Sequence, residues 1–453
     1  PSLQSSDPAI FAVGDCAHMT HAPRPKAGVF AVRQAPVLLE NLEAALTSGA
    51  MRAYKPQSDY LKLVSLGEKA AMAEKWGRGY SGAMLWRLKD RIDRKFMNKF
   101  KDLPAMGQPD LPSVHADGMV EALGPKPICG GCGAKVGRGA LGEVMSRAPS
   151  IGRDDIESVA GDDAAILRMG DTRQVISTDH LRALTLDPFV MARIAAVHAL
   201  GDIWAMGARP QAATATVILP RLSDALQRRT LSEIMEAARE AMADAGAAIV
   251  GGHSSVGAEL TIGFTVTGLC DAPPITLEGA TPGDALILTK PLGSGVIFAA
   301  EMASAAPGAV VAACLEQIQQ GQGAASRTLA PAHAMTDVTG FGLAGHLSGI
   351  CAASGVAAEV TLADVPLMEG ALALSDAGHF SSLMPANRQG AGTVIGAEGP
   401  RGDLMFDPQT AGGLLAAVPE EAAEDILRRL TGAGYPAARI GRIVEGPAVV
   451  TFL

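Results

Sequence analysis

The feature that most constrains the fold is an alternation of short apolar segments with longer helical ones through the last two thirds of the chain. Short runs rich in apolar and β-branched residues are typical of strands, and longer runs with apolar residues at helical spacing are typical of helices. The alternation therefore predicts an α/β (α+β) protein. The strand candidates are 174–178, 212–219, 247–250, 261–269 and 285–288, and the helix candidates are 188–206, 224–245 and 340–353.

Residues 271–283 interrupt this alternation and include Pro273, Pro274 and Pro282. Clustered prolines mark loops, so we expect a hinge between two α/β halves. The predicted domains are 1–112, a linker and mobile head over 113–150, an N-terminal half over 151–272 and a C-terminal half over 273–453.

Residues 1–112 differ from the rest, because they hold two of the three tryptophans and a basic run over residues 86–100. Apolar residues at 86, 88, 92, 96 and 100 fall at helical spacing. This helix could bind a membrane surface or a partner, but a helix with a solvated basic face is the favoured interpretation. The chain starts at Pro1 with what looks like a strand already under way, so we expect the natural gene product to begin further upstream.

The bulk composition argues against several classes of partner. The net charge is −9 and aromatic residues make up 4%, which disfavours a general nucleic-acid or anionic-membrane surface. No charge-free apolar stretch reaches the ~18 residues that a transmembrane helix needs. The six irregularly spaced cysteines predict no disulfide framework, and without a signal peptide a cytoplasmic location is expected.

Acidic residues recur in settings where a carboxylate is costly unless it is paired or bound to metal. Asp162 and Asp163 lie in a turn before a strand, Asp179 ends the next strand, Asp202 interrupts an apolar helix, and Asp337 precedes a glycine-rich helix start. Any one of them alone is more simply a turn or N-cap residue. The set together predicts a magnesium site across the two halves, where Mg²⁺ would meet phosphate oxygens.

Three glycine-rich turns accompany these acids. Residues 289–295, Thr-Lys-Pro-Leu-Gly-Ser-Gly, follow a strand and open a helix, so their N–H groups could bind an anion. They are not a Walker A loop, and a plain strand–turn–helix explains them equally well. Residues 248–254 and 407–413 form two further turns, each a modest signal alone.

The segment Cys129-Gly-Gly-Cys132-Gly-Ala-Lys135 has three interpretations. A zinc site would need further ligands, and no second Cys or His pair is nearby. A thioredoxin-like redox site would directly follow a strand, which the prolines at 125 and 127 argue against. The third is a nucleophilic or chalcogen-carrying cysteine on a flexible loop, with Lys135 lowering the thiol pKa or neutralising phosphate.

In their order along the chain, these motifs resemble those of the selenide, water dikinases, members of the aminoimidazole ribonucleotide synthetase superfamily. The resemblance spans about residues 128–453 and implies that superfamily's architecture of two α/β halves, ATP and selenide as substrates, Mg²⁺ and a homodimer joined through the N-terminal sheets. The motifs that carry it are 131–135, 162–165, 177–179, 193–196, 202–207, 251–254, 289–293, 335–342 and 407–413.

Matched position by position, the resemblance implies site residues of three kinds. The catalytic pair is Cys132 and Lys135, and the metal ligands are Asp163, Asp202 and Asp337. The ATP-binding residues are Lys135, Asp163, Asp179, Asp202, Gly251, Gly252, His253 and Ser254.

The chain departs from the family pattern at two positions. His198 stands where the family often has Asn, and Ala134 stands where it usually has a second head cysteine. Cys129 lies upstream instead, so a two-cysteine mechanism does not carry over from relatives.

Residues 1 to about 110 resemble the C-terminal portion of a type II NADH dehydrogenase-like flavoprotein through residues 10–17 and 23–34, with Asp15 matching a flavin contact. No Gly-x-Gly-x-x-Gly fingerprint is present, so we expect FAD only in a longer natural fusion. Two rival hypotheses are a flavin-linked oxidoreductase using Cys129 and Cys132 and a non-catalytic nucleotide-binding module.

Overall fold

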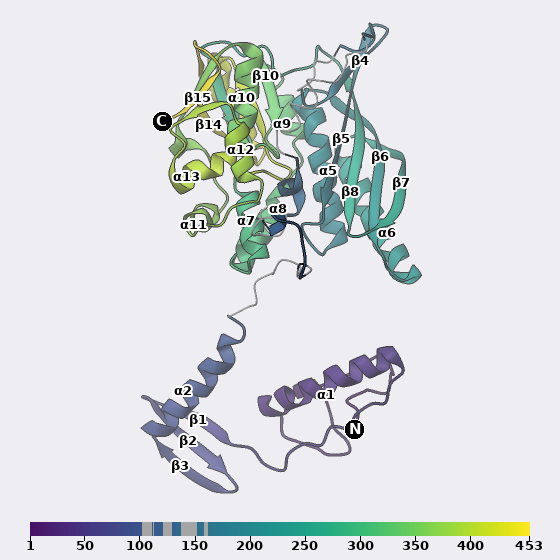
Figure 1. Ribbon diagram of the computed structural model, residues 1–453, viewed down its shortest axis with the longest axis vertical. Helices are drawn as coiled ribbons and strands as arrows, with labels where there is room; N and C mark the ends of the chain where they lie inside the picture. Colours follow the sequence, from purple (N-terminus) through teal and green to yellow (C-terminus); the bar gives the residue numbers. More distant parts are fainter. Residues whose placement is uncertain (102–110, 112, 121–128, 137–151, 158–161) are drawn as a thin grey trace. The chain divides into compact units, whose positions relative to one another are not determined.

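The structure is a computed structural model that describes residues 1–101, 111, 113–120, 129–136, 152–157 and 162–453 (Figure 1). The chain separates into two compact units, Pro1–Leu103 and Pro104–Leu453. Among the helices of the described ranges, none is long and apolar enough to cross a membrane.

The first unit contains one long helix, a small sheet and a second helix. Its antiparallel sheet has the order β1-β2-β3, and a small cluster of Leu3, Val37 and Tyr54 packs near α1. The predicted basic helix is α2, and it buries none of its residues. The bounds are α1 Gly28–Thr47, β1 Lys62–Gly67, β2 Ala70–Lys75, β3 Arg78–Gly82 and α2 Ala83–Asn98. The flavoprotein resemblance of this unit stays a prediction.

The second unit begins with an α/β half built on a five-stranded sheet of order β4-β5-β8-β6-β7. Only β6 and β7 pair in parallel; the other neighbours are antiparallel. Its elements are β4 Ala165–Met169, β5 Thr172–Arg182, α5 Pro188–Ala205, β6 Arg209–Pro220, α6 Asp224–Asp244, β7 Ala248–Gly257 and β8 Thr261–Cys270.

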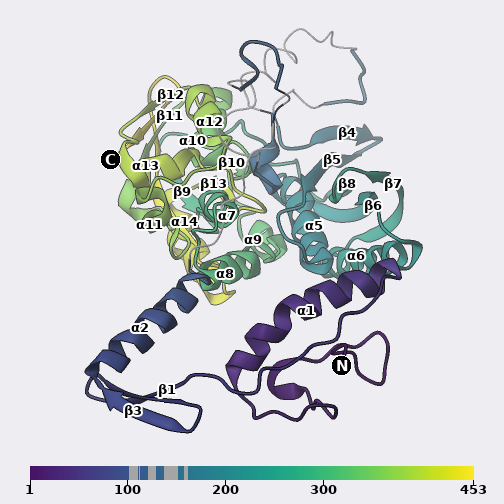
Figure 2. The ribbon, with the colours of Figure 1, turned by 60° about the horizontal axis from the view of Figure 1, so that its bottom comes forward.

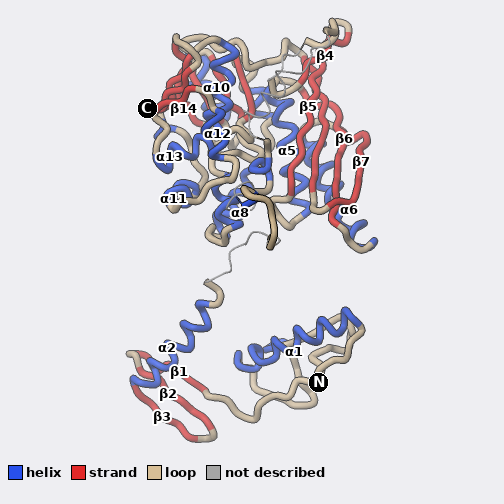
Figure 3. Tube along the Cα trace, viewed as in Figure 1, coloured by secondary structure: helices blue, strands red, loops and turns tan. Residues whose placement is uncertain are grey.

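Helix α5 positions most of the site. Its N-terminus is well defined, because the Asp187 side chain accepts from the N–H groups of Phe189 and Val190, and Pro188 occupies the first turn. Fourteen of its residues are buried, since α5 lies between its own sheet and the second half (Figures 1 and 3). A helix covered on all sides can be apolar all round, and the few polar side chains on it then need a specific partner.

The C-terminal half has a mixed seven-stranded sheet of order β10-β13-β9-β14-β11-β15-β12. Its strands are β9 Ala285–Leu288, β10 Ala334–Asp337, β11 Ala357–Val360, β12 Thr393–Ile395, β13 Leu414–Val418, β14 Ala438–Val444 and β15 Val449–Phe452. Its helices are α7 Ser294–Met302, α8 Gly308–Ile318, α9 Gly323–Thr328, α10 Gly342–Ser354, α11 Ala371–Asp376, α12 Met384–Gly390, α13 Gly399–Asp403 and α14 Glu420–Gly432. Figure 2 views the two halves from a second direction.

The predicted α/β class and two-half organisation are confirmed. Strands and helices occur at all the predicted places, although several strands are longer than expected; β5, for example, covers 172–182 rather than 174–178. Residues 271–284, which include the predicted hinge, contain no helix or strand. One apolar core runs through both halves, so the two halves pack against each other. Of the predicted linker and head, residues 113–120 and 129–136 are described, and 131–134 form a short 3-10 helix.

Candidate active site

Three carboxylates from both halves meet at the junction between them. Asp163 lies just before β4, Asp202 lies on α5, and Asp337 ends β10. Each offers a ligand oxygen, and these three oxygens all lie within 4.8 Å of one another. The fold therefore brings together the three carboxylates predicted as metal ligands, and their binding of metal stays a prediction.

A chain of hydrogen bonds orients Asp163. The Thr339 N–H donates to Nε2 of His346 at 3.1 Å, so the neutral ring carries its proton on Nδ1. That nitrogen lies 3.2 Å from the Thr336 hydroxyl, which in turn donates to Oδ1 of Asp163 at 2.9 Å. His346 and Thr336 thus hold the Asp163 carboxylate in place, an arrangement that is common behind metal ligands. Sequence reasoning missed His346, which lies on α10 after the predicted glycine-rich helix start.

The electrostatics of this cluster suit a divalent cation. Burial, together with the nearby Asp202, raises the pKa of Asp163 well above its usual range. Burial and the charge of Asp163 raise the pKa of Asp337 to about 7. Oδ2 of Asp163 is buried and has no hydrogen-bond partner among the described residues. Buried acids that repel one another and leave an acceptor unsatisfied fit Mg²⁺, which prefers oxygen ligands.

Helix α5 approaches the cluster closely at Gly201, the residue that precedes Asp202. A Cβ atom at this position would lie 2.3 Å from Oδ2 of Asp337. Ser177 on β5 donates a hydrogen bond to Oδ2 of Asp202. Gly201 therefore lets helix α5 approach the end of β10, and Ser177 orients the carboxylate of Asp202.

Cys132 lies beside this cluster and contacts His198. Its Sγ is 3.3 Å from Nε2 of His198, which also lies 3.2 Å from Oδ2 of Asp179. The N–H of Ala411 faces Nδ1 at 3.4 Å, so Nε2 carries the proton in the neutral ring as it does in the cation. Burial disfavours the charged ring, but Cys132 and Asp179 outweigh this effect and raise the pKa of His198. His198 can therefore donate a hydrogen bond from Nε2 to the Cys132 sulfur and hold it in place.

Lys135 lies next to Asp179, and both line the cavity described below. Its Nζ is 3.7 Å from Oδ1 of Asp179 and 5.9 Å from the centre of the Phe341 ring. Burial alone would raise the pKa of Asp179, but His198 and Lys135 outweigh it and hold the pKa below its usual range. Cys132, Lys135, Asp179, His198 and Phe341 all line a cavity of about 290 Å³.

The two cysteines of the head differ in their surroundings. Both are buried and free, but only Cys132 lines the cavity. The side chain of Cys129 packs against Gly133, where an added Cβ would lie 2.6 Å from Cys129 Cβ, and its N–H donates to the Ser382 hydroxyl. This arrangement favours Cys132 as the reactive residue.

Residues 251–254 lie on β7, the edge strand at the end of the five-stranded sheet opposite β4. All four are exposed, and none lines the cavity that Cys132 faces. The structure does not join them to the carboxylate cluster, so their assignment to ATP binding stays a prediction.

The N–H groups of the glycine-rich turn at 289–295 are hydrogen-bonded to side chains of this chain. Oε1 of Gln409 accepts from the N–H groups of Gly293 and Ser294 at 2.9 and 3.2 Å, and Asp407 accepts from Gly295 at 3.0 Å. Lys290 is fully buried, donates to the carbonyl of Ala411, and has its pKa lowered by burial to about 7. These contacts favour the strand–turn–helix interpretation over an anion site, because the donors at the start of α7 already have acceptors.

Comparisons with known proteins test the family resemblance of residues 128–453. Residues 161–270 match the model of the N-terminal domain of AIR synthase related proteins, and residues 281–453 match that of the C-terminal domain. The chain is 35% identical over 334 residues to a selenide, water dikinase of Burkholderia ambifaria, covering 71% of this chain and 94% of that protein. The chain belongs to the selenide, water dikinase family. A selenide, water dikinase of Geobacter metallireducens is 36% identical over 333 residues, covering 69% of this chain and 94% of the relative.

Solved structures support the fold. A protein of Thermus thermophilus aligns with a TM-score of 0.54 at 22% identity, covering 70% of this chain and 96% of that protein. Thiamine monophosphate kinase of Aquifex aeolicus aligns with a TM-score of 0.51 at 18% identity, covering 69% of this chain and 96% of that protein. At these identities the likeness concerns the fold alone, and it confirms the two-half architecture expected for a member of the selenide, water dikinase family.

Proposed function

We propose that the chain makes selenophosphate from ATP, selenide and water and releases AMP and orthophosphate. The observation that carries this proposal is the convergence of a head cysteine, a lysine and a three-carboxylate cluster at one junction, in a member of the selenide, water dikinase family. Selenide would attack the γ-phosphorus of ATP, giving selenophosphate and ADP. Water would then attack the β-phosphorus of ADP, giving AMP and orthophosphate.

Asp163, Asp202 and Asp337 would hold Mg²⁺. The fit rests on an all-oxygen donor set, on mutual repulsion among buried acids, and on the unsatisfied Oδ2 of Asp163. When bound, the ion would offset negative charge on the phosphates. The hydrogen bonds from Thr336 and Ser177 would keep two of the three ligand carboxylates oriented.

The head would supply the groups that handle selenium and phosphate. Cys132 would hold selenide by a non-covalent contact with its sulfur and deliver it to the γ-phosphorus, with no bond between sulfur and selenium. His198 is a positioning residue that would fix the sulfur by a hydrogen bond from Nε2. Lys135, at the rim beside Asp179, would neutralise the anions as the loop closes and water is excluded.

Two further parts of the proposal concern assembly and location. The edge strand β7 leaves Val250 and Val256 exposed at 68% and 57%, which suits pairing with a second copy into a homodimer. Six free cysteines suit a reducing compartment such as the cytoplasm.

Phosphorus NMR of an anaerobic reaction with ATP, Mg²⁺ and selenide tests the reaction. We expect AMP, orthophosphate and selenophosphate in equal amounts, with little ADP released. A reaction without selenide is the control. ADP accumulating in the amount of ATP consumed would instead indicate an ordinary small-molecule kinase.

A further inference from the structure

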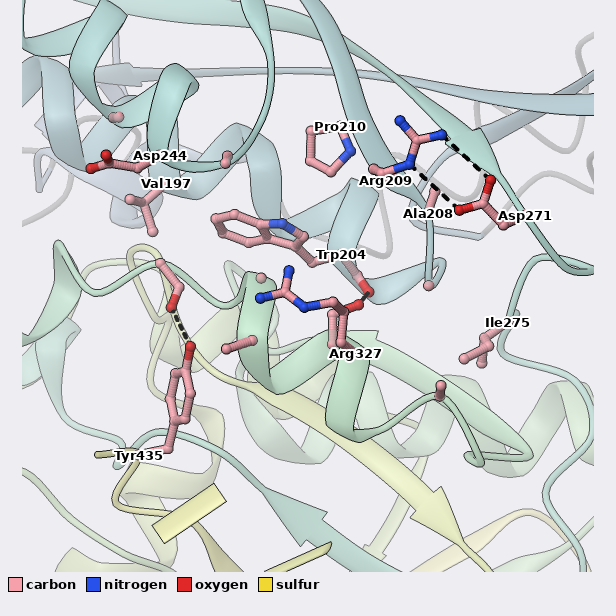
Figure 4. A pocket seen from close by; sticks show the side chains of 18 of the residues that line it. Val197, Trp204, Ala208, Arg209, Pro210, Asp244, Asp271, Ile275, Arg327 and Tyr435 are labelled. Atoms are coloured by element: carbon pink, nitrogen blue, oxygen red, sulfur yellow. Dashed lines mark hydrogen bonds and ion pairs between the residues drawn. The ribbon is translucent and has the colours of Figure 1, made fainter. Parts of the chain in front are cut away.

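A second cavity, of about 520 Å³, lies between the two halves of the second unit (Figure 4). It shares no lining residue with the cavity that Cys132 faces, and it contains none of the predicted site residues. Helices α5 and α6 contribute from the first half, while α9 and Tyr435 contribute from the second.

Two hydrogen-bond donors converge in this cavity. A Cβ atom on Gly323 would lie 3.3 Å from Nε1 of Trp204 and 3.6 Å from Nη1 of Arg327, so both nitrogens face the same point (Figure 4). Trp204 is only 4% exposed. Among the described residues neither the indole N–H nor the guanidinium has a hydrogen-bond or ion-pair partner. Both groups can only donate, so a molecule that meets them must bring an acceptor.

The other charged or polar groups of the cavity have partners. Arg209 pairs with Asp271 at 3.4 Å, and Arg193 pairs with Glu240 at 3.1 Å. The Tyr435 hydroxyl donates to the Gly321 carbonyl at 2.9 Å. Among the described lining residues, Arg327 is therefore the cation that lacks a carboxylate, and a negatively charged group would complement it.

The remaining walls are apolar. Val197, Pro210 and Ile275 line the cavity together with several alanines (Figure 4). A volume of about 520 Å³ falls in the range of small-molecule sites, which are mostly apolar with a few placed polar groups. These walls suit a compact organic body attached to the anionic group.

We propose that this cavity is a second binding site of the chain, for a small organic anion. Its carboxylate or phosphate group accepts hydrogen bonds from Trp204 Nε1 and Arg327, and its apolar body occupies the space beside Val197, Pro210 and Ile275.

The site is connected to the carboxylate cluster through α5. Trp204 follows Asp202 by two residues, and its carbonyl oxygen accepts from the Ser326 hydroxyl at 2.7 Å, next to Arg327 on α9. A ligand that bridges Trp204 and Arg327 therefore ties α5 to α9 close to the junction of the halves. By thermodynamic reciprocity, any change it causes in Mg-ATP affinity is matched by a change in its own affinity.

Calorimetry of the full chain with benzoate and phenyl phosphate as probes tests the proposal, with benzamide and benzamidine as neutral and cationic controls. We expect one anion per chain, and a preference between the two anions identifies the head group. Arg327→Gln should weaken anion binding by about tenfold, as expected for loss of a charge-assisted bond. Gly323→Ala should also weaken it, because the methyl group occupies the point where the donors converge.

Arg221→Gln, an exposed arginine outside the cavity, is the matched control and should bind like the wild type. Thermal unfolding of each variant checks that the fold is intact. Absence of saturable anion binding, equal binding of benzamide, or unchanged binding in both Arg327→Gln and Gly323→Ala overturns the proposal. So does complete displacement of the probe by Mg-ATP with no effect of Arg327→Gln, which would place the anion at the carboxylate cluster. These measurements need no turnover, so their outcome does not depend on whether the proposed reaction is correct.

Discussion

Gly201→Ala should damage the carboxylate cluster while leaving the helix that carries it intact. The added Cβ would lie 2.3 Å from Oδ2 of Asp337, whereas ordinary contacts begin near 3.4 Å. The carboxylate must therefore move by about 1 Å, since helix α5 is packed on all sides and cannot retreat.

A displacement of this size is large for the site but small for the fold. Metal–ligand distances are normally held within ~0.2 Å, so a shift of ~1 Å removes one ligand. Misplacement by ~1 Å typically lowers a catalytic rate by about 100-fold. Alanine in a helix interior is otherwise favoured over glycine by roughly 0.5–1 kcal/mol, which offsets part of the strain in the free energy of unfolding.

The assay is the rate of AMP formation as a function of Mg²⁺ concentration, together with the thermal unfolding midpoint. We expect a rate lower by about 100-fold, with the midpoint within a few degrees of the wild type. Gly432→Ala is the matched control: it ends helix α14, has nothing within 4 Å of the new methyl, and should keep full activity. Wild-type Mg²⁺ dependence in Gly201→Ala would mean that Asp337 is not a metal ligand.

Four further predictions address the head, the cluster and the first unit. Cys132→Ser should abolish selenide-dependent turnover and Cys129→Ser should keep most of it, because only Cys132 lines the cavity; the reverse result would contradict the assignment. His198→Asn should change the rate at which Cys132 is alkylated, as followed by mass spectrometry, because the Nε2 donor 3.3 Å from its sulfur is lost. An unchanged rate would leave His198 with a packing role only. Asp337 in the metal-free site has a pKa of about 7, so its proton must leave before Mg²⁺ binds, and the affinity for Mg-ATP should rise with pH up to about 7. Asp337→Asn should weaken Mg-ATP binding and flatten this pH dependence. Calorimetry in buffers of different ionisation enthalpy measures the released protons. Residues 1–110 should bind no flavin in this chain, and a near-stoichiometric flavin absorbance band in the purified protein would contradict this.

Several of the residues that meet at the junction of the halves were candidates from the sequence. Asp163, Asp179, Asp202 and Asp337 stood out because an acid among apolar residues or glycines needs a partner. That Asp163, Asp202 and Asp337 are the metal ligands was implied by the family resemblance. The pairing of Cys132 with Lys135 came from the match of the head motif to the family, since the residues alone left three interpretations open. His346 could not be found in this way, because its role depends on α10 bringing its ring next to Thr336 and Thr339.

The role of the glycine-rich turn at 289–295 could not be decided from the sequence. Its composition allowed either an anion site or a plain helix start. The structure decides between them through Asp407 and Gln409, which lie more than a hundred residues later and accept from its N–H groups. Hydrogen-bond partners so distant along the chain are not visible in a local pattern.

By itself, the sequence determined the α/β class, the two halves and the candidate ligands, because these follow from local periodicity, turn residues and the cost of isolated charges. Only the tertiary structure decided which side chains meet. It brought His198 against Cys132, placed Asp337 against Gly201, and left Trp204 and Arg327 facing one cavity with no acceptor among the described residues. Contacts of this kind depend on how α5 packs between its sheet and the second half, and that packing is set by long-range burial rather than by neighbours in the chain.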